Sequence, residues 1–336
     1  MRRGLEALVQ LGAPSLLVVA VGLVSTTVSA ANQVYFLNAL VSVAIVVAIY
    51  VFVGNSGVLS FGQISFVAVG AFAAGVMTVP LDSKKGVLTT LFPLLRNHTI
   101  GNVPSLLLAA GLGGLFAFLV GLPLMRLNGL AAGIATFAVL EITNNVLTEW
   151  TKIGPGATTL SLVPDTTGAL QGTLGALVAI AVAFAYQRSR LGRQLRASRE
   201  DSAAAAGVGV SVHAQRLWAF TLSGALAGFA GALLVHQLGS ITTNQVFLDL
   251  TFLTLAMLVI GGTTSLWGAV VGALAVSGVD SLLAVAENGT RFAGIHVDFH
   301  SGTRLVFLSA IMALVLILRP SGLTGGREAR LPWGRR

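Results

Sequence analysis

Charge and cysteine are both scarce in this 336-residue sequence, and each shortage excludes a class of protein. Cysteine is absent, so disulfides, thiolate chemistry and cysteine-based metal sites are excluded. Only 10% of the residues are charged, whereas a soluble domain carries about 25%, and the chain therefore cannot cover a water-facing surface. Its 55% hydrophobic content and mean hydropathy of +0.87 indicate an integral membrane protein, and the apolar residues run continuously rather than alternating as in a β-barrel.

Lysine is scarce as well, which bears on catalysis. The only lysines are Lys84, Lys85 and Lys152, and none of them follows a glycine. The phosphate-binding loop Gly-x-x-x-x-Gly-Lys-Ser/Thr is therefore absent, and this chain does not hydrolyse ATP by that machinery. His296 and His300 stand four residues apart, a spacing that could ligate a metal on a helix, but their loop setting favours solvated histidines. We expect no metal, no cofactor and no enzymatic activity.

Long apolar runs predict an all-α fold, a polytopic transmembrane helix bundle of about ten spans (8–10) in one domain over residues 1–336. About 20 apolar residues are long enough to cross the hydrocarbon of a bilayer. The first run ends in Val28-Ser29-Ala30, which has the small residues of a signal-peptidase site, although a retained first span is favoured. The runs cover residues 14–31, 34–53, 64–79, 104–124, 129–147, 172–186, 217–235, 250–260, 266–283 and 305–318.

A helix-prone polar segment, residues 188–216, divides these runs into six before it and four after it. The N-terminus, this segment and the C-terminal tail 319–336 therefore share one side of the membrane. The basic residues on that side are Arg2, Arg3, Arg126, Arg188, Arg190, Arg193, Arg196, Arg199, Arg216, Arg319, Arg327, Arg330, Arg335 and Arg336, which is 14 of the 20. Because lysine and arginine gather in cytoplasmic loops, we expect the two termini and the polar segment of this membrane protein to be cytoplasmic. Topology, rather than nucleic-acid binding, then explains the net charge of +8.

Polar or glycine-rich residues interrupt the apolar runs at three places. Irregular backbone at membrane depth is tolerated only where it is buried in protein or lines a wet cavity, so residues 54–63 form either a cytoplasmic turn or part of a pathway. Glu141 either snorkels outward or faces a pathway. Broken helices such as the one at Gly261-Gly262 often meet at substrate sites, whereas Gly224-x-x-x-Gly228 and Gly268-x-x-x-Gly272 indicate close helix packing. Our pathway candidates are Asn55, Ser56, Ser60, Gln63, Glu141, Gly261 and Gly262.

Five blocks, in order, resemble the branched-chain amino-acid ABC permeases of the LivH/LivM type, and the LivM-like half more closely. They are Gly54–Gln63, Phe137 with Glu141-Ile142, Gly192–Val208, Met257–Gly262 and Arg319–Gly325. The resemblance implies the permease subunit of an ABC importer, working with two ATPase subunits, a second permease subunit and an extracytoplasmic substrate-binding protein. The second permease could be a copy of this chain or a relative. Two positions depart from the family pattern, Lys152 to Gly156 and Thr264, and they leave the substrate open.

The polar segment also supports a docking role by itself, because a soluble partner can reach only what lies outside the lipid. We expect this cytoplasmic coupling loop to contact the ATPase subunit through five residues, with Gly207 allowing the turn: Arg199, Glu200, Asp201, Ala204 and Gly207. Branched-chain or other aliphatic amino acids are the favoured substrates, ahead of urea or short amides and of sugars or nucleosides. The alternatives from other classes are an ion-coupled secondary carrier, which the shortage of ionisable residues in the spans disfavours, and a scaffolding subunit without transport.

Overall fold

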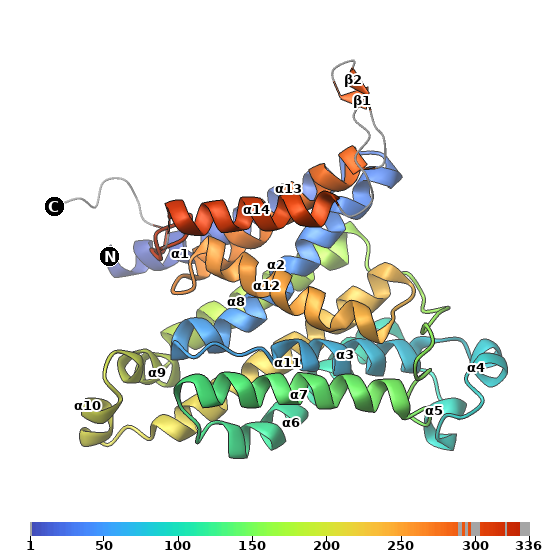
Figure 1. The fold of residues 1–336 in the computed structure, drawn as a ribbon, viewed down its shortest axis with the longest axis horizontal. Helices are drawn as coiled ribbons and strands as arrows, with labels where there is room; N and C mark the ends of the chain where they lie inside the picture. The colour runs from blue at the N-terminus through green and yellow to red at the C-terminus, as the bar shows by residue number, and fades with distance from the viewer. Residues whose placement is uncertain (1, 288–290, 293–294, 297–302, 320, 330–336) are drawn as a thin grey trace.

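The computed structural model describes residues 2–287, 291–292, 295–296, 303–319 and 321–329. The described part is almost entirely helical (Figure 1), which confirms the predicted all-α bundle. A two-residue antiparallel hairpin, β1 (Arg291–Phe292) and β2 (Ile295–His296), is the exception. The helices are α1 (Arg2–Thr27), α2 (Ala30–Ser56), α3 (Gln63–Thr78), α4 (Leu81–Val87), α5 (Pro93–Asn97), α6 (Asn102–Leu124), α7 (Gly129–Glu149), α8 (Ala169–Arg188), α9 (Arg190–Glu200), α10 (Ser202–Gly207), α11 (Val212–Leu238), η1 (Thr243–Val246), α12 (Leu248–Gly261), α13 (Leu266–Glu287) and α14 (Thr303–Leu318).

Each predicted apolar run corresponds to one helix, but three of these helices are short. Among the described residues, 8 helices are long and apolar enough to cross a membrane, or up to 9 if α3 and α4, which meet at 110°, form one broken span. The short members are α3 and α14, each 16 residues long, and α12, whose 14 residues reach spanning length only together with η1. The count lies within the predicted range of 8–10, and α3 is short because the chain before it, residues 57–62, is not helical.

The core of the bundle is α2 and α11, which pack against each other; α11 also packs against α6 and α3, and α2 against α8 and α13. α2 is buried on all sides from Val43 to Ser56, as expected of a helix that is apolar all round. Glycines allow the close approach of α11: a Cβ on Gly228 would collide with the carbonyl oxygen of Ala109 on α6. A Cβ on Gly272 would likewise collide with the carbonyl oxygen of Met257 on α12. The predicted role of these spaced glycines in helix packing is therefore confirmed.

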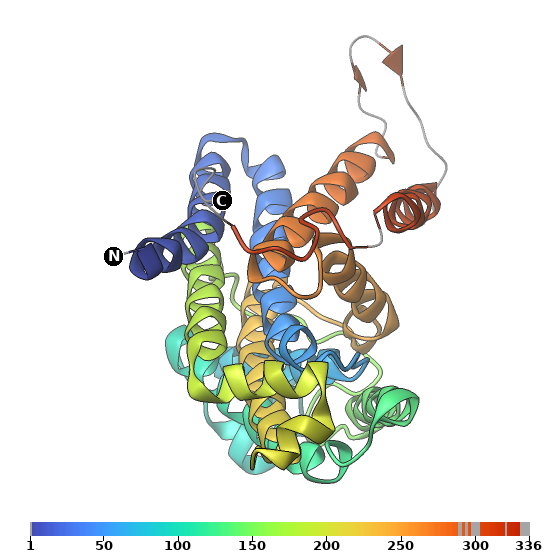
Figure 2. The same cartoon turned by 90° about the vertical axis from the view of Figure 1, so that its left-hand side faces the viewer.

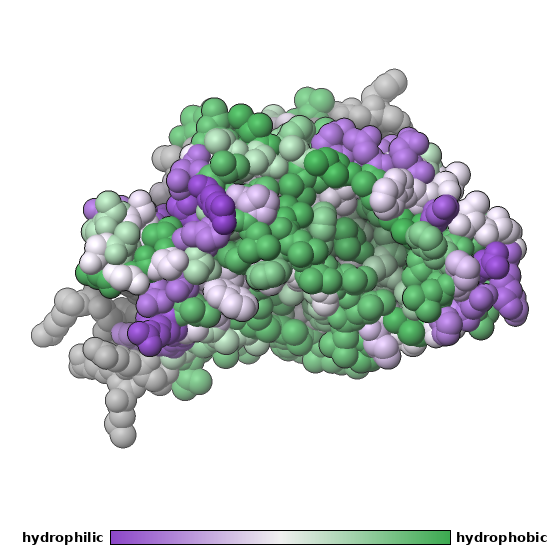
Figure 3. Space-filling model, turned by 90° about the horizontal axis from the view of Figure 1, so that it is seen from below, coloured by the Kyte–Doolittle hydropathy of each residue, from purple (hydrophilic) through white to green (hydrophobic). Residues whose placement is uncertain are grey.

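The two polar ends of the molecule differ in composition and are separated by an apolar middle. α9 and α10 lie at one end, together with the start of α1 and the end of α14 (Figure 1). α4 and α5 lie at the opposite end. Seen from the α9–α10 end, α7 and α14 stand at the periphery of the bundle (Figure 2). The face seen from below is apolar across its middle and polar at both ends (Figure 3).

Candidate functional site

The polar segment folds into two short helices with side-chain caps. Ser189 begins α9, and its hydroxyl oxygen accepts a hydrogen bond of 3.1 Å from the Gly192 N–H. Asp201 begins α10, and its carboxylate accepts bonds of 2.9 Å from the N–H groups of Ala203 and Ala204. Capping of this kind satisfies N–H groups that have no partner inside the helix. The predicted helix-prone loop is therefore an ordered pair of helices that projects from one end of the bundle.

Four of the five residues expected to contact the ATPase subunit lie on the outer surface of this pair. Glu200, Asp201, Ala204 and Gly207 are all exposed. Gly207 is the last residue of α10, and the left-handed residue of the turn is Gly209, with φ of 82°. The expectation that Gly207 supplies the special turn conformation is wrong, because α10 continues through Gly207 and the chain reverses two residues later.

The fifth residue, Arg199, contacts the bundle although part of it is exposed. Its Nη1 donates a hydrogen bond of 3.1 Å to the carbonyl oxygen of Gly54, near the end of α2. Its aliphatic part lies over Gly57, where an added Cβ would come within 2.9 Å of Cγ of Arg199. Gly57 has φ of 71°, a conformation that favours glycine, and it ends α2. Arg199 therefore joins the projecting helix pair to the point where the second span stops being helical.

Two further contacts attach α9 to the spans, and a third joins α8 to α2. Arg196 donates to the carbonyl oxygen of Gln187 on α8, and the side-chain oxygen of Gln187 accepts a bond of 2.8 Å from the hydroxyl of Tyr50 on α2. The Gln215 amide on α11 donates to Gln194 Oε1 at 3.0 Å. The sequence did not predict these contacts, because they join residues of different helices. Together they couple the position of α9 to the ends of α2, α8 and α11.

The break between α2 and α3 runs back into the bundle. Residues 57–62 are extended and pass alongside α7, where the hydroxyl of Thr136 accepts a bond of 3.2 Å from the Phe61 N–H. Thr136 lies seven residues into α7, which corresponds to about 10 Å from the start of that helix at 1.5 Å per residue. A Cβ on Gly62 would lie 2.5 Å from the Thr136 carbonyl oxygen, so the two backbones touch. Residues 57–62 therefore pack against α7 rather than standing apart from the bundle.

Buried polar side chains surround this break, and several of their atoms have no partner. Within the described residues, no hydrogen bond reaches Asn55 Oδ1, Ser60 Oγ, Gln63 Nε2 or Ser65 Oγ. The hydroxyl of Ser223 on α11 lies 3.0 Å from Gln63 Oε1 and 2.7 Å from the carbonyl oxygen of Ala48. A buried polar atom without a partner is costly, which is why such atoms are usually bonded to protein or to water. These atoms therefore have hydrogen-bonding capacity that the described residues do not use.

Gly261 and Gly262 lie at the same end of the molecule as Asn55 and Ser56. A Cβ on Gly54 would come within 2.7 Å of the Thr263 carbonyl oxygen, so the turn after α12 touches the end of α2. The C-terminal segment, residues 322–328, covers this turn: Thr324 Oγ1 donates to the Gly261 carbonyl at 2.8 Å. The Glu328 carboxylate accepts bonds of 2.9 and 3.2 Å from the N–H groups of Leu266 and Trp267, the first residues of α13. The turn is therefore a packing junction in which the Gly261 carbonyl is already bonded.

Glu141 does not join the other pathway candidates. It is exposed on α7, and its carboxylate accepts a bond of 3.1 Å from Asn145 one turn further along the same helix. The side of α7 that faces α3 instead carries Thr136, Leu140 and Thr143, which are buried. The structure thus brings together four of the pathway candidates: Asn55, Ser56, Ser60 and Gln63. Gly261 and Gly262 lie beside this group, on the side nearer α9. Glu141 lies on the opposite side of α7.

The described residues hold no group of three or more histidine, aspartate or glutamate side chains that could bind a metal ion. Of the predicted histidine pair, His300 lies outside the described residues. These features define a polytopic α-helical membrane protein with a broken span and a helical element projecting at one end. Residues 32–318 match the family described as branched-chain amino acid transport system / permease component, and the chain belongs to that family.

Several relatives match over most of the chain. LivM of Escherichia coli (strain K12), a high-affinity branched-chain amino acid transport system permease protein, is 28% identical over 308 residues, which cover 81% of this chain and 65% of the relative's length. The probable branched-chain amino acid transport permease protein LivM of Methanocaldococcus jannaschii is 26% identical over 298 residues, with 80% and 86% covered. An autoinducer 2 import system permease protein, LsrC of Klebsiella pneumoniae, is 30% identical over 168 residues, 45% of this chain and 47% of its own length. No solved structure matches the chain.

Proposed function

We propose that this chain is the membrane-spanning permease subunit of an ABC importer that carries branched-chain or related amino acids across the bacterial plasma membrane. ATP hydrolysis would take place on a separate pair of subunits, and a substrate-binding protein would deliver the amino acid from outside. The observation that carries the proposal is the family match over residues 32–318, together with LivM relatives that cover about 80% of the chain.

The ATPase subunit would dock on α9 and α10, with both chain termini on the same, cytoplasmic side. This end holds most of the basic residues, which supports a cytoplasmic location. The exposed surface of Glu200, Asp201, Ala204 and Gly207 supplies the contact. Closure of the ATPase dimer would then move α9, and the bond from Arg199 to Gly54 would pass that movement to the end of α2 and to the broken span.

The pathway would open at the break, where Asn55, Ser56, Ser60 and Gln63 are buried. In the structure this region is closed to solvent, and the partnerless atoms of Asn55, Ser60 and Gln63 give a passing polar solute something to bond. Gly261 and Gly262 would act at its α9 end, where movement of the turn after α12 is transmitted to α2 through Gly54. Alternating access then consists of separating α2, α7 and α11 around the extended segment 57–62.

The outward position of Glu141 supports a second permease subunit. Glu141 lies eight residues from the end of α7, which corresponds to about 12 Å at 1.5 Å per residue. A charged side chain at the centre of a lipid-facing helix costs about 3 kcal/mol, and such residues therefore face a bundle interior or a wet cavity. Among the described residues, Glu141 has only Asn145 of its own helix as a hydrogen-bond partner. A second permease, whether a copy or a relative, would cover this side of α7 and enclose a pathway that Glu141 borders.

Co-purification tests the docking surface directly. The complex is expressed with a tagged ATPase subunit, and recovery of the permease is measured for the wild type and for Glu200→Arg combined with Gly207→Pro. We expect the double variant to lose the ATPase subunit while it remains folded in the membrane. The matched control is Asp82→Arg, an exposed charge reversal on α4 at the opposite end, which should leave recovery unchanged. If the double variant and Asp82→Arg are recovered equally with the ATPase subunit, α9 and α10 are not the docking element.

A further inference from the structure

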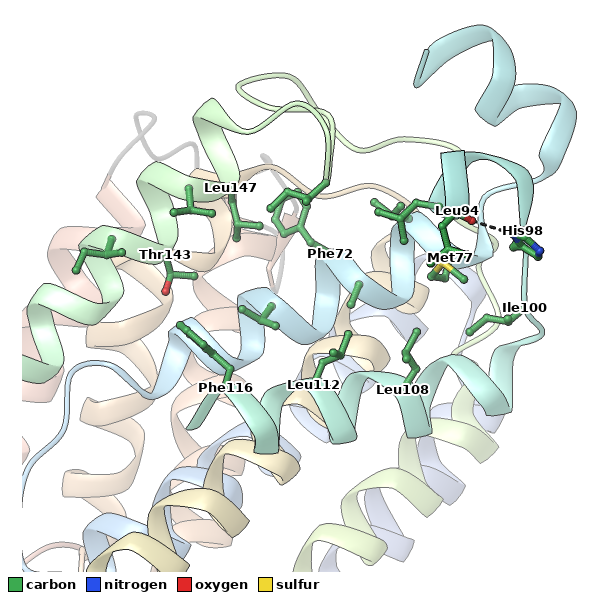
Figure 4. A pocket seen from close by; sticks show the side chains of 17 residues that line it. Phe72, Met77, Leu94, His98, Ile100, Leu108, Leu112, Phe116, Thr143 and Leu147 are labelled. Atoms are coloured by element: carbon green, nitrogen blue, oxygen red, sulfur yellow. Dashed lines mark hydrogen bonds between the residues drawn. The ribbon is translucent and has the colours of Figure 1, made fainter. Parts of the chain in front are cut away.

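A large apolar cavity lies between α3, α6 and α7 in the half of the molecule away from α9–α10 (Figure 4). Its volume is about 650 Å³. Side chains of α3 and α6 point into it: Phe72, Met77, Leu108, Leu112 and Phe116. Thr143 and Leu147 on α7 close the other side. Leu94 and His98 of the α5 region lie at one end. Neither the coupling element nor the break at residues 54–63 contributes to it.

Apart from His98 at one end, the lining offers no partner for a charged solute. Only two of the lining side chains, Thr143 and His98, carry groups that form strong hydrogen bonds. Each of them already bonds a backbone carbonyl oxygen. The Thr143 hydroxyl donates to the Val139 carbonyl at 2.8 Å, and His98 Nδ1 lies 3.0 Å from the Leu94 carbonyl oxygen. An amino acid brings an ammonium and a carboxylate group, each of which needs a polar partner when it leaves water. Water itself also needs two to four polar partners in a cavity, so neither occupant fits this one.

The cavity runs along the membrane normal and opens sideways. Leu108 and Phe116 both line it, and their separation of eight residues on α6 corresponds to about 12 Å. The opening lies between α6 and α7, because Leu112 is 37% exposed and Ile142 is 60% exposed while both line the cavity. This face of the molecule is apolar over its middle (Figure 3), which is the region that bilayer hydrocarbon surrounds. Lipid chains therefore reach the opening without crossing water.

We propose that this cavity binds an acyl chain of a bilayer phospholipid, with the headgroup at α5. The shape fits an amphipathic ligand, since an apolar slot ends at His98, with Arg96 two residues before it on α5, where a headgroup meets water. The proposal rests only on the chain spanning a membrane and not on the cargo it carries. The bound chain fills the gap between α7 and the bundle, and it steadies a helix whose main packing partners among the described elements are α3, α6 and η1.

Photo-crosslinking in nanodiscs tests this assignment. The assembled complex is placed in a bilayer that contains a phospholipid with a photoreactive acyl chain, and labelled peptides are quantified by mass spectrometry. We expect the wild type to be labelled on the segments of α6 and α7 that line the cavity. Leu112→Trp should lower that labelling at least about fivefold, because the larger side chain occupies the slot. The matched control is Leu107→Trp on the same helix, which is 69% exposed and does not line the cavity, and it should label as the wild type does.

Three outcomes would overturn the assignment. Equal labelling in both variants would show lipid at the general surface only. Labelling that free leucine competes away would make the cavity a substrate site, and crosslinking of these peptides to a second permease subunit would make it a protein interface. If Leu112→Trp fails to assemble, Ala73→Leu narrows the same cavity from α3, and it should reduce labelling without affecting assembly.

Discussion

Arg199 and Gly54 are 145 residues apart in the chain, yet the guanidinium of one donates a 3.1 Å hydrogen bond to the carbonyl of the other. The bond connects the helix pair α9–α10 to the end of α2, where the second span gives way to the extended segment 57–62. Because the same end of α2 touches Thr263, one side chain links the projecting element, the broken span and the turn after α12.

Removing this link should uncouple the complex. A hydrogen bond from a charged donor contributes about 1.5–3 kcal/mol, so we expect Arg199→Ala to reduce substrate uptake about tenfold or more. The ATPase subunits should remain bound, since Glu200, Asp201, Ala204 and Gly207 are unchanged. Uptake and ATPase activity are measured on the same reconstituted complex. Arg193→Ala is the control, because Arg193 is exposed and its side chain has no hydrogen-bond partner among the described residues. Parallel loss of uptake and of ATPase binding would show that Arg199 docks rather than transmits.

Glycine packing in the core should be sensitive to a single methyl group. At Gly228 a Cβ would collide with the Ala109 carbonyl, and we expect Gly228→Ala to destabilise the protein by about 1–3 kcal/mol through overpacking. Gly111, on the exposed side of α6, has no atom within 4 Å of an added Cβ. Gly111→Ala should therefore stabilise slightly, by about 0.5–1 kcal/mol. Thermal unfolding of the two purified variants in the same detergent measures the difference, and equal melting temperatures would refute close α6–α11 packing.

Glu328 should protect the start of α13. Its carboxylate accepts the N–H groups of Leu266 and Trp267, and a charge at a helix N-terminus is favourable. We expect Glu328→Ala to cost about 1 kcal/mol locally, which corresponds to amide exchange about fivefold faster at these two residues. Glu328→Gln keeps an acceptor oxygen and should show a smaller change. Hydrogen exchange with mass spectrometry resolves this segment. Unchanged exchange in Glu328→Ala would mean that the C-terminal segment does not cap α13 in the membrane.

Substitutions at Glu141 distinguish between two environments for this residue, a transport pathway and the lipid. If it borders a pathway beside a second permease, Glu141→Leu should abolish most uptake, whereas Glu141→Asp, which keeps the charge, should retain more. If the residue faced lipid, Glu141→Leu would remove a charge from hydrocarbon, raise the melting temperature and leave uptake intact. Uptake and thermal unfolding of the two variants, measured in the assembled complex, distinguish these results.

The sequence was sufficient for the helices but not for the contacts between distant segments. Continuous apolar runs predict every span, and the spaced glycines of α11 and α13 predict close packing, because both are local properties of one helix. The fold of residues 322–328 over the turn after α12 joins residues about 60 positions apart, and no local pattern encodes it. Thr136 and Ser223 were missed for the same reason. In the sequence, each is one hydroxyl residue within an apolar span. Only the folded structure shows that Thr136 lies beside residues 57–62 and Ser223 beside Gln63.

The positions of the polar residues were also predictable only in part. The capping residue Asp201 and the exposed surface of α10 agree with a loop held outside the lipid. The prediction named Gly207 as the turn residue, whereas the structure has Gly209 in that role. The difference arises because α10 ends later than expected, and helix propensity does not predict such boundaries to within two residues. That Glu141 points away from Asn55 and Gln63 depends on which side of α7 meets α3, and an apolar helix with no strong amphipathic pattern does not reveal this.

ATP-driven uptake of radiolabelled leucine into proteoliposomes tests the central proposal most directly. The vesicles contain this chain, its permease partner and the ATPase subunits, with a loaded binding protein on the outside. The account predicts leucine accumulation that requires both internal ATP and the binding protein, and that a proton or sodium gradient cannot replace. Uptake by this chain alone, driven by an ion gradient and indifferent to ATP, would contradict the account and identify a secondary carrier.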